Sequence, residues 1–376
     1  MLFTDSVLAQ KKQNIAMQWE VAAELPADSG MQYSLGFAGP VTGTINNVLI
    51  VAGGANFPYA MPWDGGKKKY YKEGYIYTRT QDKIVLTEKK FTLPAALAYA
   101  ASCTTLKGVF YAGGENENGV TDKAWLIQWN DNEQQIIFKS LPSLPVPVTN
   151  ASATIIGNTV YLAGGETGPG AVAQFVCLDL DNLEKGWQQL APVPHSVSHT
   201  ILISMSGKKS DAIYLSGGRK KNTNGISDFY ADVFMYDVAK NSWEVKASLP
   251  YALSAGTGTL YKKNCVVIFG GDKGVVFHQT ELLIAAINNE KDESKKQELI
   301  LQKNKLQLAH PGFSNEVLLY NSNTNIWQAI GTIPFATPVT TTAVKWKSEF
   351  IIPSGEIKAG VRSPEILSAK ILTKAK

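Results

Sequence analysis

Short apolar segments that end in two glycines recur along the chain. The first is residues 48–54, VLIVAGG, and similar segments end at Gly114, Gly165, Gly218 and Gly271. Residues 350–355, FIIPSG, form a sixth and divergent copy. The first of the two paired positions falls at 53, 113, 164, 217, 270 and 354. The pattern therefore predicts a structural unit of about 50 residues that repeats six times.

A second series of aromatic residues, each followed by a proline a few positions later, keeps step with the first. Its members are Trp19, Phe91, Phe138, Trp187, Trp243 and Trp327. Diglycine-ended strands at this period are typical of kelch repeats, in which each repeat forms one four-stranded blade. Because a blade buries its faces only against its neighbours, six copies predict an all-β, six-bladed kelch-type β-propeller, with residues 14–376 as one domain.

The two ends of the chain are expected to meet in one blade. The chain starts with an aromatic-type strand at 14–26 and finishes after a third-strand segment, so strand 14–26 should supply the missing outer strand of the last blade. Residues 1–13 are interpreted as a disordered start or the remnant of a leader.

One insertion breaks the period. About thirty extra residues separate Gly271 from Trp327, and residues 278–310 carry Leu, Ile, Glu and Lys at helical spacing. We expect one or two helices inserted in blade five, either as a lid over a pocket or as a charged surface hairpin. His278 and His310 bracket the insertion and are expected near that pocket.

Composition excludes several classes of protein. Hydrophobic residues make up 44% and charged residues 18% of 376, which is incompatible with a mostly disordered chain. The net charge of +4 gives no argument for nucleic-acid binding, and no apolar run approaches the 18 residues of a membrane-spanning helix. The three cysteines have no metal-site spacing, and His195 and His199 lack a third ligand nearby, so no metal site is predicted.

Candidate chemistry lies where the diglycine strands end, because the next residue of each repeat should leave its sheet on the same side near the axis. Residues 355–362, GEIKAGVR, place Glu356, Lys358 and Arg362 across one tight loop. A glutamate there can exchange a proton with a hydroxyl, and an arginine can bind a carboxylate. An ordinary surface ion pair would give the same string. The six residues that follow the paired positions are Ala55, Glu115, Glu166, Arg219, Asp272 and Glu356.

GEIKAGVR resembles the G-E-x-K-x-G-x-R motif of the sialate mutarotases, also called N-acetylneuraminate epimerases. The GFAG segment at 36–39, the strand NVLIVAGGANF and the helical insertion are similar to that family as well. In the family the motif lies mid-chain and GFAG follows it, whereas here the motif is near the C-terminus and GFAG near the N-terminus. This order resembles the cyclically permuted branch of the family, and a closed ring tolerates such a rotation.

The resemblance implies an isomerase without a cofactor that interconverts the α- and β-anomers of N-acetylneuraminic acid by opening the sugar ring. It implies Glu356 as the proton acceptor and Arg362 as the residue that binds the sugar carboxylate. Lys358, Asn56, Phe57, Arg219 and Glu115 are further substrate-binding candidates from their positions at the rim.

An enzyme that handles host sialic acid before uptake is expected in the periplasm or outside the cell, with the cytoplasm as the alternative. The oligomeric state stays open. The competing interpretation is a non-catalytic kelch module that binds a sialoglycan or a protein. Such a module would need Arg362 more than the carboxylate of Glu356.

Overall fold

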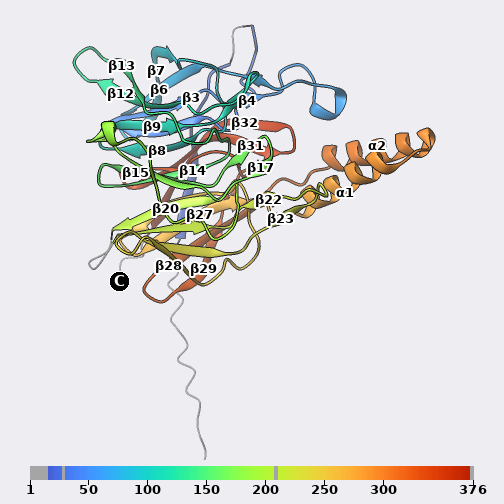
Figure 1. Ribbon diagram of the computed structural model, residues 1–376. Helices are drawn as coiled ribbons and strands as arrows, with labels where there is room; N and C mark the ends of the chain where they lie inside the picture. The colour runs from blue at the N-terminus through green and yellow to red at the C-terminus, as the bar shows by residue number, and fades with distance from the viewer. Residues whose placement is uncertain (1–15, 28–29, 207–210, 373–376) are drawn as a thin grey trace, which may run out of the picture.

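The computed structural model describes residues 16–27, 30–206 and 211–372. Its strands form six four-stranded antiparallel sheets that follow one another around a ring, which confirms the six-bladed all-β propeller (Figure 1). The predicted leader or disordered start at 1–13 lies outside the described residues. Neither described α-helix is long and apolar enough to cross a membrane.

The blades are numbered in chain order, and their strands are given from the inner to the outer one. Blade one contains β2 (Val41–Ile45), β3 (Val48–Ala52), β6 (Glu73–Thr80) and β7 (Lys83–Thr92). Blade two contains β8 (Ala101–Thr105), β9 (Gly108–Ala112), β12 (Ala124–Asn130) and β13 (Gln135–Leu141). Blade three contains β14 (Ser152–Ile156), β15 (Thr159–Ala163), β18 (Phe175–Asp179) and β19 (Gln188–Gln189).

The other three blades repeat this arrangement. Blade four contains β20 (Ile201–Ser206), β21 (Asp211–Ser216), β24 (Val233–Asp237) and β25 (Ser242–Val245). Blade five contains β26 (Thr257–Lys262), β27 (Cys265–Gly271), β28 (Ser314–Asn321) and β29 (Ile326–Thr332). Blade six contains β30 (Val344–Trp346), β31 (Glu349–Lys358), β32 (Val361–Leu372) and, as its outer strand, β1 (Ala16–Glu24).

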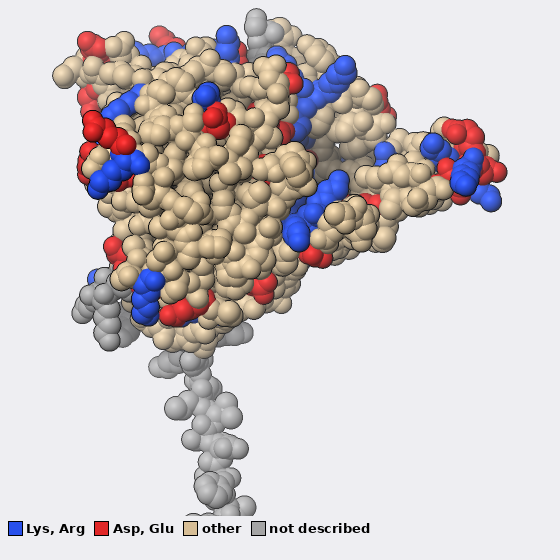
Figure 2. Space-filling view, in the orientation of Figure 1, with Lys and Arg blue, Asp and Glu red and all other residues tan. Residues whose placement is uncertain are grey.

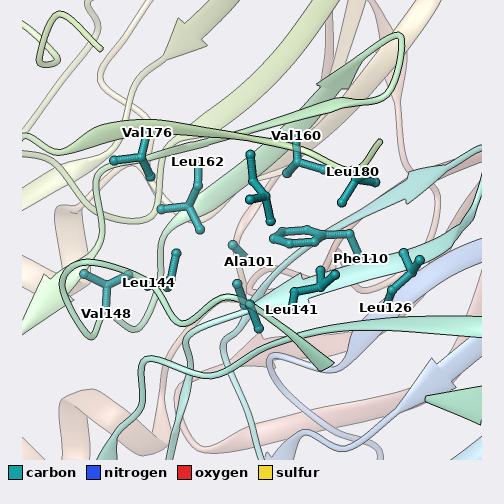
Figure 3. Close-up of a cluster of buried hydrophobic side chains, with 13 residues drawn as sticks. Ala101, Phe110, Leu126, Leu141, Leu144, Val148, Val160, Leu162, Val176 and Leu180 are labelled. Carbon is teal, nitrogen blue, oxygen red and sulfur yellow. The ribbon is translucent and has the colours of Figure 1, made fainter. Parts of the chain in front are cut away.

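Neighbouring blades bury their apolar faces against each other. Between blades two and three, Phe110, Val160, Leu162 and Val176 are fully buried in one cluster (Figure 3). Successive side chains along each strand point to opposite faces of the blade, so each blade has two apolar faces, one for each neighbouring blade. The core of the protein is therefore a series of such clusters around the ring.

The ends of the described chain lie side by side in blade six. β1 pairs antiparallel with β32, from Ala16 opposite Leu372 to Glu24 opposite Glu365. Trp19 of β1 also packs edge-on against Phe269 of blade five, with ring centroids 5.8 Å apart. This pairing covers the edge that β32 would otherwise expose.

The connection between the second and third strands of each blade leaves the ring on the same side. In blades one to four it forms a short hairpin: β4 (Ala55–Asn56) with β5 (Lys69–Tyr70), β10 (Glu115–Asn116) with β11 (Gly119–Val120), β16 (Glu166–Thr167) with β17 (Gly170–Ala171), and β22 (Arg219–Lys221) with β23 (Ser227–Phe229). In blade five it is the helical insertion, α1 (Val275–Asn289) and α2 (Glu293–Leu308). In blade six it is the end of the β31–β32 hairpin.

A closed cycle of backbone hydrogen bonds joins the six blades at the base of these connections. Each blade contributes one residue with φ between 52° and 65°. The N–H of each donates to the C=O of the residue from the preceding blade at 2.7–3.0 Å. We call this cycle the floor ring; its members are Gly39, Tyr99, Asn150, His199, Ala255 and Thr340.

Candidate active site

A cavity of about 790 Å³ lies above the floor ring, between the blade connections and the base of the helical hairpin. The hairpin projects from the body of the molecule beside a recess, with charged side chains gathered at its tip (Figures 1 and 2). The cavity size suits a small organic ligand. Its charged and titratable walls come from blades three to six and the insertion: Glu166, Arg219, Lys221, Asp272, Glu281, His310 and Glu356.

Glu356 and Arg362 face each other across the β31–β32 hairpin. They are register partners in the sheet, and Nη1 of Arg362 lies 3.5 Å from Oε1 of Glu356. The same Oε1 accepts the backbone N–H of Gly360 at 2.9 Å, so the turn fixes the carboxylate. The Glu356 side chain is 21% exposed and lines the cavity, whereas that of Arg362 is only 4% exposed.

Arg362 lies behind Glu356 rather than in the cavity wall. Its guanidinium stacks on Phe57 of blade one, 4.8 Å from the ring centroid. Its Nε and Nη1 atoms are buried, and neither has a hydrogen-bond partner among the residues that the structure describes. Arg362 is therefore placed to neutralise and orient Glu356 through its charge.

The GFAG segment and the GEIKAGVR motif form one structural unit. The Oγ of Ser354 accepts the N–H of Phe37 at 2.8 Å and contacts the carbonyls of Phe37 and Ser363 at 3.0 and 2.7 Å. A Cβ on Gly36 would lie 2.1 Å from the carbonyl oxygen of Ser363, so only glycine fits there. The divergent serine in the sixth copy thus links segments 317 residues apart.

Arg219 is the guanidinium that lines the cavity. It begins β22, and its side chain stacks on Phe277 of α1, 4.5 Å from the ring centroid. Its Nη2 lies 3.3 Å from Nε2 of His199, a member of the floor ring. Burial lowers the pKa of Arg219, and nearby carboxylates, among them Glu166 and Glu356, oppose that effect.

Asp272 and His310 complete the titratable wall in blade five. Burial raises the pKa of the Asp272 carboxyl, although the Gly274 N–H donates to its Oδ1 at 2.8 Å. Burial lowers the pKa of His310, whose Nδ1 accepts the N–H of Gly312 at 3.0 Å. A neutral His310 therefore carries its proton on Nε2.

The other predicted substrate-binding residues lie outside the cavity wall. The Asn56 amide is buried; it donates to the Gly36 carbonyl at 2.9 Å and accepts from the Tyr71 hydroxyl at 2.9 Å. Glu115 accepts hydrogen bonds from Lys68 and Tyr70 at 2.9 and 2.7 Å. These contacts hold the rim together and leave little capacity for a ligand.

Lys358 follows Glu356 on β31, and Phe57 supports Arg362. Lys358 is half-buried and does not line the cavity, although its positive charge adds to the effect of burial in lowering the pKa of His310. Of the seven residues predicted to act on or bind substrate, Glu356 and Arg219 line the cavity, and Arg362 and Phe57 form the layer behind it.

The insertion is fastened to blade four across the cavity. The buried Glu281 of α1 accepts the backbone N–H and the hydroxyl of Ser227 at 2.9 and 2.6 Å. His278 donates from Nε2 to the Ser227 carbonyl at 2.7 Å. The sequence places both His278 and His310 near the pocket; His310 lines it, and His278 anchors its wall.

The sequence did not predict contacts between segments that are far apart in the chain. Phe277, Glu281 and Gln307 line the cavity from the helices, and helical spacing alone does not say which face turns inward. The sequence offers His199 only as a metal-ligand candidate, and its contact with Arg219 comes from the fold. In the described part of the chain, no group of three or more His, Cys, Asp or Glu is arranged to hold a metal ion.

The fold and the site define a β-propeller with a small-molecule cavity that contains several carboxylates and one open guanidinium. The model of the N-acetylneuraminate epimerase family matches residues 141–376, and this chain belongs to that family. It is 29% identical over 232 residues to the N-acetylneuraminate epimerase of Salmonella typhi, and 28% identical over 233 residues to that of Brucella melitensis. Both matches cover 61% of this chain and 58% of the relative, so the chain matches less than two thirds of those relatives' length.

Proposed function

We propose that this protein is a cofactor-independent mutarotase that interconverts the α- and β-anomers of N-acetylneuraminate. The observation that carries the proposal is Glu356, a carboxylate held by Gly360 and Arg362 that lines the cavity. Family membership supports the substrate class.

In the proposed reaction Glu356 accepts the proton of the anomeric hydroxyl. The bond between the anomeric carbon and the ring oxygen breaks, and the ring oxygen takes up a proton. Asp272 is suited to deliver that proton, because it lines the same cavity and burial raises its pKa, which favours the protonated form. The open-chain ketone then rotates and closes on its other face, and both protons return to their donors.

The test is the Glu356→Gln variant. We expect the unmodified protein to accelerate loss of the α-anomer signal in proton NMR of freshly released α-N-acetylneuraminate. Glutamine keeps the shape but cannot accept the proton, so the variant should lose about 10²–10⁴-fold in rate. Glu316→Gln, which alters an exposed pair with Lys273, is the matched control and should keep full activity.

Two outcomes would count against the proposal. Equal rates for the unmodified protein and buffer would exclude catalysis on this sugar. Retention of sugar binding in that case would favour the alternative, a non-catalytic module that binds sialoglycans.

A further inference from the structure

Arg219 is a cation that opens into the cavity without a close counter-ion. Among the described residues, no carboxylate oxygen lies within 4.0 Å of its guanidinium nitrogens. The carboxylates of Glu166, Asp272, Glu281 and Glu356 act on its pKa only from longer range. Phe277 covers one face of the guanidinium plane, so its free N–H groups are directed at the edges, where an anion can bind.

A directed chain of hydrogen bonds holds Arg219. Because arginine only donates, its Nη2 must donate to Nε2 of His199, 3.3 Å away. The neutral imidazole then carries its proton on Nδ1, 3.1 Å from the Ser198 hydroxyl. Ser198 donates in turn to Oε1 of Glu166 at 2.6 Å.

The charge state of His199 allows it to accept the hydrogen bond from Arg219. Burial, together with the positive charges of Arg219 and Lys68, lowers its pKa well below the usual range. His199 therefore remains a neutral acceptor at neutral pH, and its backbone is fixed in the floor ring. One edge of the guanidinium is held on the floor while the rest stays open to the cavity.

We propose that Arg219, positioned by His199, binds the carboxylate of the acidic sugar, whereas Arg362 neutralises and orients Glu356. This inference rests on the proposed function. It moves the predicted carboxylate contact from Arg362 to Arg219, because Arg362 is buried behind Glu356 and Arg219 lines the cavity.

The chemistry of the substrate agrees with this division. The carboxylate and the anomeric hydroxyl of N-acetylneuraminate are attached to the same carbon, so the groups that bind them must face one point of the cavity. Arg219 and Glu356 both line the cavity, and the charge of Glu356 acts on the pKa of Arg219. Arg219 can bind the carboxylate while Glu356 accepts the proton of the anomeric hydroxyl.

The test compares N-acetylneuraminate with its methyl ester, which lacks the negative charge. Binding is measured by titration calorimetry and turnover by NMR. We expect the unmodified protein to bind the acid about 10- to 100-fold more tightly than the ester, as for loss of a charged hydrogen bond. Arg219→Gln should abolish this preference and raise KM for the acid by a similar factor, with kcat within a few-fold. Arg362→Gln should lower kcat for both compounds and keep the preference.

The role of His199 is tested separately. His199→Phe removes the acceptor and should raise KM for the acid about 3- to 10-fold while weakening the preference for acid over ester. His199→Gln retains an oxygen that can accept from Arg219, so it should restore both values. A purely structural role would lower the melting temperature without changing the preference. If His199→Phe does not fold, His199→Ala removes the same acceptor without adding volume, and the same rise in KM and loss of preference are expected. An unchanged preference in that variant would overturn the role of His199.

The calorimetric preference does not depend on turnover, which separates this inference from the proposed function. Loss of the preference in Arg219→Gln supports the inference even if no catalysis is found. A preference that survives in Arg219→Gln and disappears in Arg362→Gln would overturn it. Failure of the unmodified protein to bind either compound would overturn both.

Discussion

Among single residues, Glu349 forms a buried ionic cluster between blades six and one. Its carboxylate accepts hydrogen bonds from Arg79, Ser368 and Lys370, each at 2.7 Å. Burial alone would raise the pKa of this carboxyl, but these hydrogen bonds outweigh burial and lower it from 4.5 to about 2. The Arg79 side chain is also nearly inaccessible, at 3% exposure, and stacks on Trp346.

Glu349→Gln should therefore lower the free energy of unfolding by about 3 kcal/mol at pH 7, because it leaves Arg79 buried without a counter-ion. The pKa is lower in the folded than in the unfolded state, so the carboxylate stabilises the fold fully above about pH 4.5, and this stabilisation is lost as the pH falls towards 2. Urea unfolding between pH 7 and pH 3 should show the difference from the unmodified protein narrowing. Glu244→Gln, in an exposed pair with Lys246, is the control and should leave the free energy of unfolding almost unchanged, because solvent screens surface pairs.

Residue types and spacing identified the rim positions but not their partners. Glu356 and Arg219 are predictable as rim residues because each follows a diglycine or its equivalent, and both line the cavity. The burial of Arg362 could not be foreseen, because it depends on Phe57, which is about 300 residues away in the chain. The part played by His199 depends on a contact between two segments of blade four that spacing does not reveal.

At the level of elements, the helical insertion forms one wall of the cavity. The sequence predicted helices within 278–310, and the structure has two, with α1 beginning three residues earlier at Val275. Glycine precedes α1, and no side chain caps it, so the start has no strong sequence signal. Glu281 and His278 both bind Ser227 and fasten this wall to blade four.

Glu281→Ala should loosen this attachment. It removes two hydrogen bonds to a buried carboxylate, so amide hydrogen exchange in α1 and the β22–β23 hairpin should become about tenfold faster or more. Glu298→Ala, at an exposed position of α2, is the matched control and should leave exchange unchanged. Equal exchange in both variants would mean that the apolar contacts of α1 alone hold the wall.

For the whole molecule, the range of the family match agrees with a rotated order of blades. The match begins at Leu141, the last residue of β13, and leaves out blades one and two, β1 and the GFAG segment. An alignment keeps the residues of both chains in sequence order. It can therefore match only the blades that lie on one side of the permutation point, so a permuted chain would give a partial match of this kind. The ring itself was predictable, because each diglycine strand repeats the same local geometry.

A further rotation should therefore be tolerated. We expect a variant that joins the ends beside Ala16 and Leu372 with a short flexible linker, and opens the chain in the exposed turn between β12 and β13, to fold into the same ring. β13 then becomes the closing strand, as β1 is now. Circular dichroism melts should show one cooperative transition within about 10 °C of the parent, allowing for a cost of 1–2 kcal/mol. A control opened within β15, at the centre of blade three, should fail to fold.

The floor ring has a consequence for how such a cavity can change its ligand. Its hydrogen bonds use only backbone atoms, and the six members here are as different as glycine, tyrosine, asparagine, histidine, alanine and threonine. Ala255 and Thr340 also line the cavity, so a substitution at either alters the shape and polarity at its bottom while the backbone bonds that unite the blades remain. Gly39 is the exception, because a Cβ there would lie 2.5 Å from the backbone nitrogen of Tyr99. The architecture thus separates the part that must be conserved for assembly from the part that can be varied for recognition, and new specificities can arise one blade at a time.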